Sequence, residues 1–437
     1  MTRRIVSEGA WVLFGQGASA LGALLGIRLL TELLAPATFG ELALVIGIAA
    51  LAVGLVGNPL TQALLRYYPD STRTIGVESL RKSVVACLFK AAVAFSAIWL
   101  VGWWLYSEAT GASHWIGLLV VALLAVDLAR SVEVAFFNAA RRQRPMAVLI
   151  AADAWGRPIV AVAGITLVGA TVSAVVAGYV TATLILLTVL YFVAEREGVN
   201  SAKSAVEPDA VHTRELLRYA LPLVPLGVIG WIFNLSDRYV LAGLSGLEQA
   251  GMYAAAFAVA SRPAWLLGGA VETTLRPVYF HAVSSGDLKQ QAGIFRNWLM
   301  LQLSVVVVLT TTFWFFSDEI SYWLLGERFR SAAPLMPWIA GGCGIIVVAQ
   351  AFAGLCYASR DTTQVLKIEL TGALARVVIS YPAIYMAGLS GAAIAVPISA
   401  VVQLTAAIVM SRRFLPMAAP MQNGALASRR VRLRPSK

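Results

Sequence analysis

The sequence predicts an all-α protein that crosses a membrane about twelve times. Three observations support this class. Apolar blocks of about 20 residues, long enough to span the hydrocarbon core of a bilayer, fill most of the chain. Lys and Arg gather in every second gap between the blocks. Spacings found in the first half of the chain recur in the second half.

The apolar blocks define the expected spans in order. The first block follows Met-Thr-Arg-Arg, as in a signal peptide, but its apolar stretch exceeds the usual ~7–15 residues, so we interpret it as a span. A polar stretch from Glu195 to Glu215 separates six blocks from six more. The block centres lie near Leu24, Leu51, Ala94, Leu124, Val160, Leu184, Gly230, Ala258, Val306, Ile345, Val378 and Ala400.

The basic gaps predict the orientation. The positive-inside rule assigns gaps rich in Lys and Arg to the cytoplasm. The opposite gaps hold only Arg328 and Arg330. With an even number of spans, both termini are expected in the cytoplasm, and the protein is expected in the bacterial inner membrane. The basic gaps contain Arg3, Arg4, Arg66, Arg73, Arg81, Lys82, Arg141, Arg142, Arg144, Arg196, Lys203, Arg214, Arg218, Arg276, Lys289, Arg296, Arg360 and Lys367.

Composition agrees with a membrane protein. Hydrophobic residues make up 59% of the chain and charged residues 13%, against about 25% charged in soluble domains. The net charge of +11 belongs largely to loops that set the topology, so no nucleic-acid partner is expected. The basic tail at 412–437 suits a topology anchor or contact with anionic membrane lipids. Cys87, Cys343 and Cys356 lack ligand spacing, so neither a disulfide framework nor a metal site is predicted, and no cofactor is expected.

Matching spacings indicate an internal duplication. Arg28 and Gly40 are 12 residues apart, and Arg238 and Gly251 are 13 apart. Each glycine precedes another arginine, by 26 residues in the first half and by 25 in the second. We therefore predict a lobe of six spans at 1–194, a cytoplasmic connector at 195–216, a second lobe of six spans at 217–411, and the tail at 412–437. Repeated halves of transporters usually enclose a central cavity.

Several charged residues inside the spans have a local partner. Asp153 and Arg157 lie four residues apart, which places them on one helical face. Arg28 and Glu32 have the same spacing. Asp127 opens a predicted ladder down the fourth span, followed by Arg130 and Glu133. Since a charge at mid-span costs at least ~2.5–3.5 kcal/mol, structural ion pairs are the favoured interpretation of these groups.

Two other arginines lack a local partner. Arg262 has no acidic residue three or four positions away, and Arg376 has only Glu369, two turns distant. Each needs a partner on another helix, water, or a bound anion. The guanidinium group binds phosphate in a bidentate manner, so Arg262 is the first candidate for an anion contact, followed by Arg376, although interhelical salt bridges explain both equally well.

Two prolines strengthen the expectation of a cavity. Arg157 and Arg262 each precede a proline, which removes a backbone hydrogen bond and is tolerated where the helix lines a cavity or packs on protein. Five polar side chains are plausible on the cavity wall or between helices: Asn58, Gln62, Asn234, Gln302 and Gln350.

Each half of the chain carries a motif at its span boundaries. In the second half, Leu221-Pro222 enters the seventh span, Asp237-Arg238-Tyr239-Val240-Leu241 ends it, and Gly251-Met252-Tyr253 opens the eighth. In the first half, Arg28-Leu29-Leu30 is followed by Leu34-Ala35-Pro36-Ala37-Thr38-Phe39-Gly40. These two motifs resemble those of the polysaccharide-transporter (Wzx-like) flippases, which share a superfamily (MOP) with MATE exporters and lipid II flippases. The length, the number of spans and the duplication extend the resemblance over the whole chain.

The resemblance implies a V-shaped fold of two lobes. It also implies transfer of an undecaprenyl-diphosphate-linked oligosaccharide between membrane leaflets, for export of a surface polysaccharide. Relatives keep arginines in the cavity, and here Arg28, Arg157, Arg262 and Arg376 could serve. Asp237 and Arg238 match the signature and also suit a structural role at the end of the seventh helix. Implied partners are the lipid-linked substrate and the polymerase and co-polymerase proteins of the polysaccharide pathway.

Three functions remain open from the sequence. A flippase is the leading hypothesis, because of the duplicated signatures and the arginines without local partners. A cation-coupled, MATE-like antiporter would need unpaired acidic residues, and only Asp127 and Asp153 offer themselves, each with an arginine nearby. A membrane glycosyltransferase, polymerase or ligase usually needs a substantial exterior catalytic loop. The predicted outer gaps are short except around 318–330, so catalytic residues are not expected and the chain is not predicted to be an enzyme.

Overall fold

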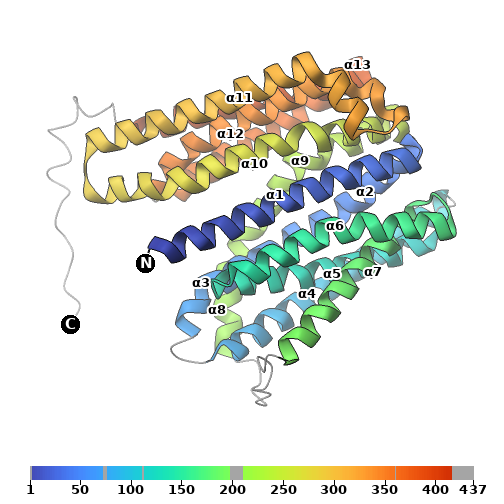
Figure 1. Cartoon of the computed structure of the whole chain (residues 1–437), viewed down its shortest axis with the longest axis horizontal. Helices are drawn as coiled ribbons and strands as arrows, with labels where there is room; N and C mark the ends of the chain where they lie inside the picture. Colours follow the sequence, from blue (N-terminus) through green and yellow to red (C-terminus); the bar gives the residue numbers. More distant parts are fainter. Residues whose placement is uncertain (1, 72–75, 111–112, 197–209, 360, 416–437) are drawn as a thin grey trace.

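The computed structural model describes residues 2–71, 76–110, 113–196, 210–359 and 361–415, and the regular elements in these ranges are all helical. Figure 1 shows their arrangement. In chain order they are α1 (Thr2–Leu33), α2 (Pro36–Ala52), η1 (Val53–Gly57), α3 (Asn58–Ser71), α4 (Val77–Thr110), α5 (His114–Ala139), α6 (Gln143–Val168), α7 (Val172–Arg196), α8 (Ala210–Ala220), η2 (Leu221–Leu223), α9 (Val224–Ser245), α10 (Leu247–Ser285), α11 (Leu288–Leu324), η3 (Glu327–Leu335), α12 (Met336–Ala358), α13 (Thr362–Ser411) and η4 (Arg412–Phe414).

The helices account for all the predicted spans. Eleven continuous helical runs among the described residues are long and apolar enough to cross a membrane. The last of these includes α13, which has 50 residues and folds back at Gly388 (φ 52°, ψ −125°). Because a side chain is strained at this positive φ, glycine permits the reversal. The two arms of α13 are the eleventh and twelfth spans, so the prediction of an all-α membrane protein is confirmed.

The outer surface fits a multi-pass membrane protein. Large apolar side chains point outward along the helices, and among those that are more than two-thirds exposed are Ile98, Leu167, Trp323 and Met386. In water such surface would cause aggregation, whereas a bilayer covers it at no cost.

The helices form two bundles. Figure 1 shows α3 to α7 in the lower bundle and α9 to α13 in the upper one, with α1 and α2 between them. Helix α8, which overlaps the predicted connector, packs on the lower bundle, where Leu216 and Ala220 join the core formed with Leu64 and Leu80. Residues 197–209 of the connector and 416–437 of the tail lie outside the described residues.

The bundles meet at one end and spread apart toward the other (Figure 1). The end where they spread carries the basic α5–α6 and α10–α11 connections and is called the basic end below. At the opposite end two glycines allow the backbone of α2, between the bundles, to touch that of α10 in the upper bundle. A Cβ on Gly40 would lie 2.0 Å from the carbonyl oxygen of Leu247, and one on Gly251 would lie 2.0 Å from that of Pro36. We call this reciprocal contact between α2 and α10 the glycine contact.

A second contact closes the same end. The backbone N–H of Gly326, before η3, donates to Thr31 Oγ1 on α1 at 2.8 Å. The Arg28 guanidinium donates to the carbonyl oxygen of Leu325 next to it. Phe39 on α2 packs edge-on against Phe329 in η3, with ring centroids 5.4 Å apart. The end opposite the basic loops is therefore sealed by backbone contacts and aromatic packing.

Candidate functional site

A cavity of about 370 Å³ lies between the two bundles. Helices α1, α2, α6 and α7 line it from the first half of the chain, and α9 and α10 from the second. Its walls are mostly apolar, and its polar side chains are those of Arg157, Tyr179, Arg238, Ser261 and Arg262. Three arginines thus face one interbundle cavity, and both halves of the chain contribute to it.

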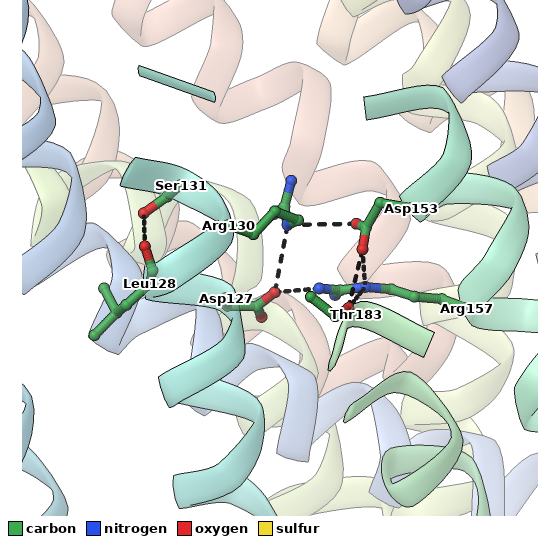
Figure 2. Close-up of polar contacts among 7 residues, drawn as sticks. All are labelled: Asp127, Leu128, Arg130, Ser131, Asp153, Arg157 and Thr183. Atoms are coloured by element: carbon green, nitrogen blue, oxygen red, sulfur yellow. Dashed lines mark hydrogen bonds and ion pairs between the residues drawn. The ribbon is translucent and has the colours of Figure 1, made fainter. Parts of the chain in front are cut away.

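Arg157 lies in a polar network formed by charged side chains on α5 and α6 and by the Thr183 hydroxyl on α7 (Figure 2). Its Nε donates to Asp153 Oδ1 at 2.9 Å and to Thr183 Oγ1 at 3.0 Å, and another guanidinium nitrogen donates to Asp127. Arg130 Nε lies 3.4 Å from Asp153 and 3.7 Å from Asp127. Two arginines and two aspartates balance, so this N-half charge cluster adds no net charge to the cavity.

The network confirms one local prediction and corrects another. Asp153 and Arg157 form the expected pair across one helical turn. The predicted ladder on α5 is wrong at Glu133, which pairs instead with Arg81 on α4. Arg130 turns toward Asp127 and Asp153 because two buried carboxylates there need neutralising, whereas Glu133 lies nearer the basic end, where α4 supplies a cation.

Arg238 and Arg262 differ from Arg157 because neither has a carboxylate within ion-pair distance among the described residues. The Nε of Arg262 donates to the carbonyl oxygen of Ala258, one turn back on α10, at 3.1 Å. The guanidinium of Arg238 lies over the Phe257 ring, 5.5 Å from its centroid, and its buried Nε has no described hydrogen-bond partner. These two side chains give the cavity two positive charges that the surrounding described groups leave unneutralised.

Arg376 does not line the cavity. Its side chain is 1% exposed and forms an ion pair of 2.6 Å with Asp237 on α9. Further bonds join the guanidinium to Ser399 Oγ at 3.1 Å and to the Tyr253 hydroxyl at 3.3 Å. Asp237 accepts from Ser380 and from Tyr253, each at 2.7 Å. Of the partners expected for Arg376, the structure shows a carboxylate on another helix, so Arg376 belongs to a C-half charge cluster and not to the cavity wall.

The two clusters reflect the duplication. Arg157 and Arg376 are each fourteen residues after the first residue of their helix, on the fifth and eleventh spans. Each bonds a hydroxyl on the next span, Thr183 in the first half and Ser399 in the second. The equivalence is hidden in the sequence because the carboxylate partners differ: they come from α5 and α6 in one half and from α9 in the other.

The remaining candidates lie elsewhere. Arg28 pairs with Glu32 at 2.7 Å, as predicted, and sits at the sealed end without lining the cavity. Asn58 begins α3 with an exposed side chain, directly after the π-helical turn η1. Gln350 lies within the upper bundle, where its Nε2 donates to Glu369 Oε1 at 2.8 Å.

Sequence reasoning gave Arg238 a structural role and did not include Tyr179. Asp237 and Arg238 are adjacent, and successive residues of a helix point about 100° apart, so one can face its own bundle while the other faces the cavity. The structure has this arrangement, with Asp237 buried and Arg238 on the cavity wall. The angle between Asp237 and Arg238 on the helix could therefore have indicated that Arg238 faces the cavity when Asp237 is buried. We see no comparable signal for Tyr179.

The sequence profile of a family described as "Polysaccharide biosynthesis protein" matches residues 5–283. The chain belongs to this family. A search of curated proteins by sequence gave no match.

Solved structures show the fold. An inward-facing multidrug resistance MATE family transporter of the MOP superfamily superposes with a TM-score of 0.68 at 13% identity, covering 94% of this chain and 96% of that one. The lipid II flippase MurJ in an inward closed conformation gives 0.65 at 12% identity, covering 94% and 88%. A mutant of the Vibrio cholerae MATE transporter VcmN gives 0.61 at 13% identity, covering 95% and 97%. This member of the polysaccharide biosynthesis family therefore has the fold of MOP transporters.

Proposed function

We propose that this protein is a flippase that moves an undecaprenyl-diphosphate-linked oligosaccharide across the bacterial inner membrane by alternating access, as a step in surface polysaccharide export. The observation that carries the proposal is the interbundle cavity with the two unneutralised arginines, Arg238 and Arg262. Guanidinium groups bind phosphate oxygens through paired, charge-assisted hydrogen bonds. A diphosphate would supply the negative charge that this site lacks.

The chemistry of such a substrate suits the site. Its polyprenyl tail is stable in lipid, and only the charged, hydrated head needs a path through the membrane. Phe39 and Phe257 in the cavity wall offer apolar surface for sugar rings, while the arginines hold the diphosphate. No bond is made or broken in this step, so the proposed activity is transport and not catalysis.

The side from which the substrate enters the cavity can be inferred from which end of the molecule is sealed. The positive-inside rule places the basic end in the cytoplasm, together with both termini. The glycine contact and the Gly326–Thr31 hydrogen bond close the opposite, periplasmic end. In this state the cavity would accept substrate made on the cytoplasmic face, and parting of the sealed end would release it outside. Polymerase and co-polymerase proteins would then use the product.

The experiment uses a strain that lacks the gene and any paralogue. Lipid-linked repeat units should then accumulate facing the cytoplasm, protected from a membrane-impermeant label applied to spheroplasts. The wild-type gene should restore labelling, and so should Arg296→Gln, which removes an exposed arginine outside the cavity. The Arg238→Gln/Arg262→Gln double variant should not. Normal labelling in the deletion strain would refute the proposal, and drug efflux driven by an ion gradient in purified vesicles would favour the antiporter instead.

A further inference from the structure

A hollow of about 440 Å³ lies on the exposed side of α4, near the start of that helix at the basic end. Helix α4 packs on α3, α5 and α8, and Figure 1 shows it on the side of the lower bundle away from the upper one. No described residue of α4 lines the interbundle cavity, so the α4 hollow is a separate site. Its lining residues are Glu78, Arg81, Lys82, Val85, Ala86 and Phe89.

The lining residues follow the order of chemistry in one leaflet of a bilayer. The charged side chains lie nearest the start of α4, and the apolar ones follow toward its middle. Val85 and Phe89 are 47% and 69% exposed, so their apolar surface needs a cover. From Glu78 to Phe89 the helix rises roughly 16 Å, close to half of the ~30 Å hydrocarbon core. A single phospholipid can therefore place its headgroup at the charged end and an acyl chain along the apolar part.

The charged end of the hollow offers both signs of charge. Arg81 forms an ion pair with Glu133 on α5 and lies over the Phe136 ring, 5.2 Å from its centroid, so its guanidinium is held in place. A guanidinium has five N–H donors, more than one carboxylate uses. Glu78 and Lys82 are four residues apart and share a face of α4. An exposed pair with this spacing is weak, so a headgroup can insert between its members.

The balance of charge selects the class of headgroup. Two basic and two acidic side chains gather here, so an anion would meet as much repulsion as attraction. A headgroup that carries a phosphate and a cation matches both signs. A primary ammonium also has N–H groups to donate to a carboxylate, which a quaternary ammonium lacks.

We propose that the α4 hollow binds one phospholipid of the cytoplasmic leaflet whose headgroup carries a phosphate and a primary ammonium, as in phosphatidylethanolamine. Arg81 and Lys82 bind the phosphate, and Glu78 accepts hydrogen bonds from the ammonium. An acyl chain lies along Val85 and Phe89. This lipid stays with the protein and is not the transported substrate, so the inference goes beyond the proposed function.

The test uses the purified full-length protein, stripped of lipid in detergent. Native mass spectrometry measures the affinity for the first bound lipid, with phosphatidylethanolamine, phosphatidylcholine and phosphatidylglycerol of identical acyl chains. The variants are Glu78→Gln, which removes the partner of the ammonium, and Lys82→Gln, which removes a partner of the phosphate. The matched control is Lys90→Gln, which removes an exposed lysine of the same helix outside the hollow.

The wild type should bind phosphatidylethanolamine ~5-fold more tightly than either other lipid. Glu78→Gln should abolish the preference over phosphatidylcholine, Lys82→Gln should weaken both of these lipids alike, and the control should match the wild type.

Three results would overturn the proposal. Equal binding of phosphatidylethanolamine and phosphatidylcholine by the wild type, or a preference that survives Glu78→Gln, would remove the role of the carboxylate. Tighter binding of phosphatidylglycerol would reveal a general contact with anions. Absence of any bound lipid would mean that another part of the chain fills the hollow. No readout uses a glycan, so this proposal and the flippase proposal fail independently.

Discussion

The four arginines inside the spans fall into two groups, although they are the same residue type. Arg376 is fully buried and Arg157 lies partly buried at the cavity wall, and both have carboxylates and hydroxyls placed to receive them. Arg238 and Arg262 face the interbundle cavity, and the described residues offer them no carboxylate. Buried pairs organise a bundle, whereas unneutralised charges at a cavity attract an anion. The two groups should respond to substitution in opposite ways.

Replacing Arg262 or Arg238 with Gln should reduce transport without reducing stability. Each loses charge-assisted hydrogen bonds to a diphosphate, which corresponds to a ~10- to 100-fold weaker interaction. The folded protein loses an unneutralised charge, so the midpoint of thermal unfolding in detergent should stay the same or rise. Measured affinity for a diphosphate lipid and the unfolding midpoint together check this expectation. A fall in the midpoint with unchanged affinity would mean that these arginines are structural.

Replacing Asp237 with Leu should have the reverse effect. It leaves the Arg376 guanidinium buried without a counter-charge, which typically destabilises a protein by ~3–5 kcal/mol. The Asp237→Leu/Arg376→Leu double variant should recover most of the loss, because replacing a whole buried pair with apolar groups is often close to neutral. Thermal unfolding of the single and double variants measures the effect. A double variant as unstable as the single one would contradict the pairing.

At the scale of single residues, the sequence predicted the ion pairs that form within one helix. The Asp153–Arg157 and Arg28–Glu32 pairs follow from spacing on a helical face, and both are present. The partners of Arg376 and Glu133 come from other helices, so they depend on packing that spacing does not encode. The side of the helix on which Arg238 lies depends on packing in the same way.

The helical elements were predictable because membrane thickness sets their length. All twelve block centres fall in helices, including the two arms of α13, which reverse at Gly388 between the expected block centres near Val378 and Ala400. Interruptions within spans were harder to predict. The π-helical turn η1 interrupts the span formed by α2 and α3. Helix α8 precedes the seventh span but packs on the lower bundle. Both features follow from contacts between helices, and a hydropathy pattern carries no information on such contacts.

The glycine contact between α2 and α10 gives the repeated glycines a role. Replacing Gly40 with Leu places a side chain where Leu247 O lies 2.0 Å from an ideal Cβ. The strain, roughly 1–3 kcal/mol, should shift the population toward a parted end by ~5- to 150-fold. An Ala43→Cys substitution places a thiol in the cavity. Its labelling by a membrane-impermeant thiol reagent added from the periplasmic side should therefore increase.

Gly243→Leu is the matched control, because a Cβ on Gly243 meets nothing within 4 Å. It should leave labelling at the level of the parent protein. Equal increases in both variants would show that added bulk, and not the glycine contact, opens the end.

The whole molecule consists of two halves with a common plan and different charge arrangements. Equivalent arginines on the fifth and eleventh spans anchor each bundle internally, and the cavity forms where the bundles face each other. The sequence predicted this architecture from the duplication, and the structure has it. Which arginines face the cavity depended on how the bundles pack, and was not predictable from one span at a time.

If transport requires the bundles to part, tying the sealed end shut should stop it. Phe39 on α2 and Phe329 in η3 pack across that end with ring centroids 5.4 Å apart, and both can be replaced by Cys in a background without Cys87, Cys343 and Cys356. A short, reducible bifunctional thiol reagent should then join them. Outward labelling of lipid-linked repeat units should fall to the level of the deletion strain and return after reduction.

The control joins helices of one bundle. Trp314 on α11 and Trp338 on α12 lie with ring centroids 6.2 Å apart, so the same substitutions and reagent should tie them with no effect on labelling if each bundle moves as a rigid body. Loss of transport in the control alone would mean that helices move within the upper bundle. Transport that persists with the Phe39–Phe329 positions fully joined would show that the head group leaves by a path that does not pass between α2 and η3.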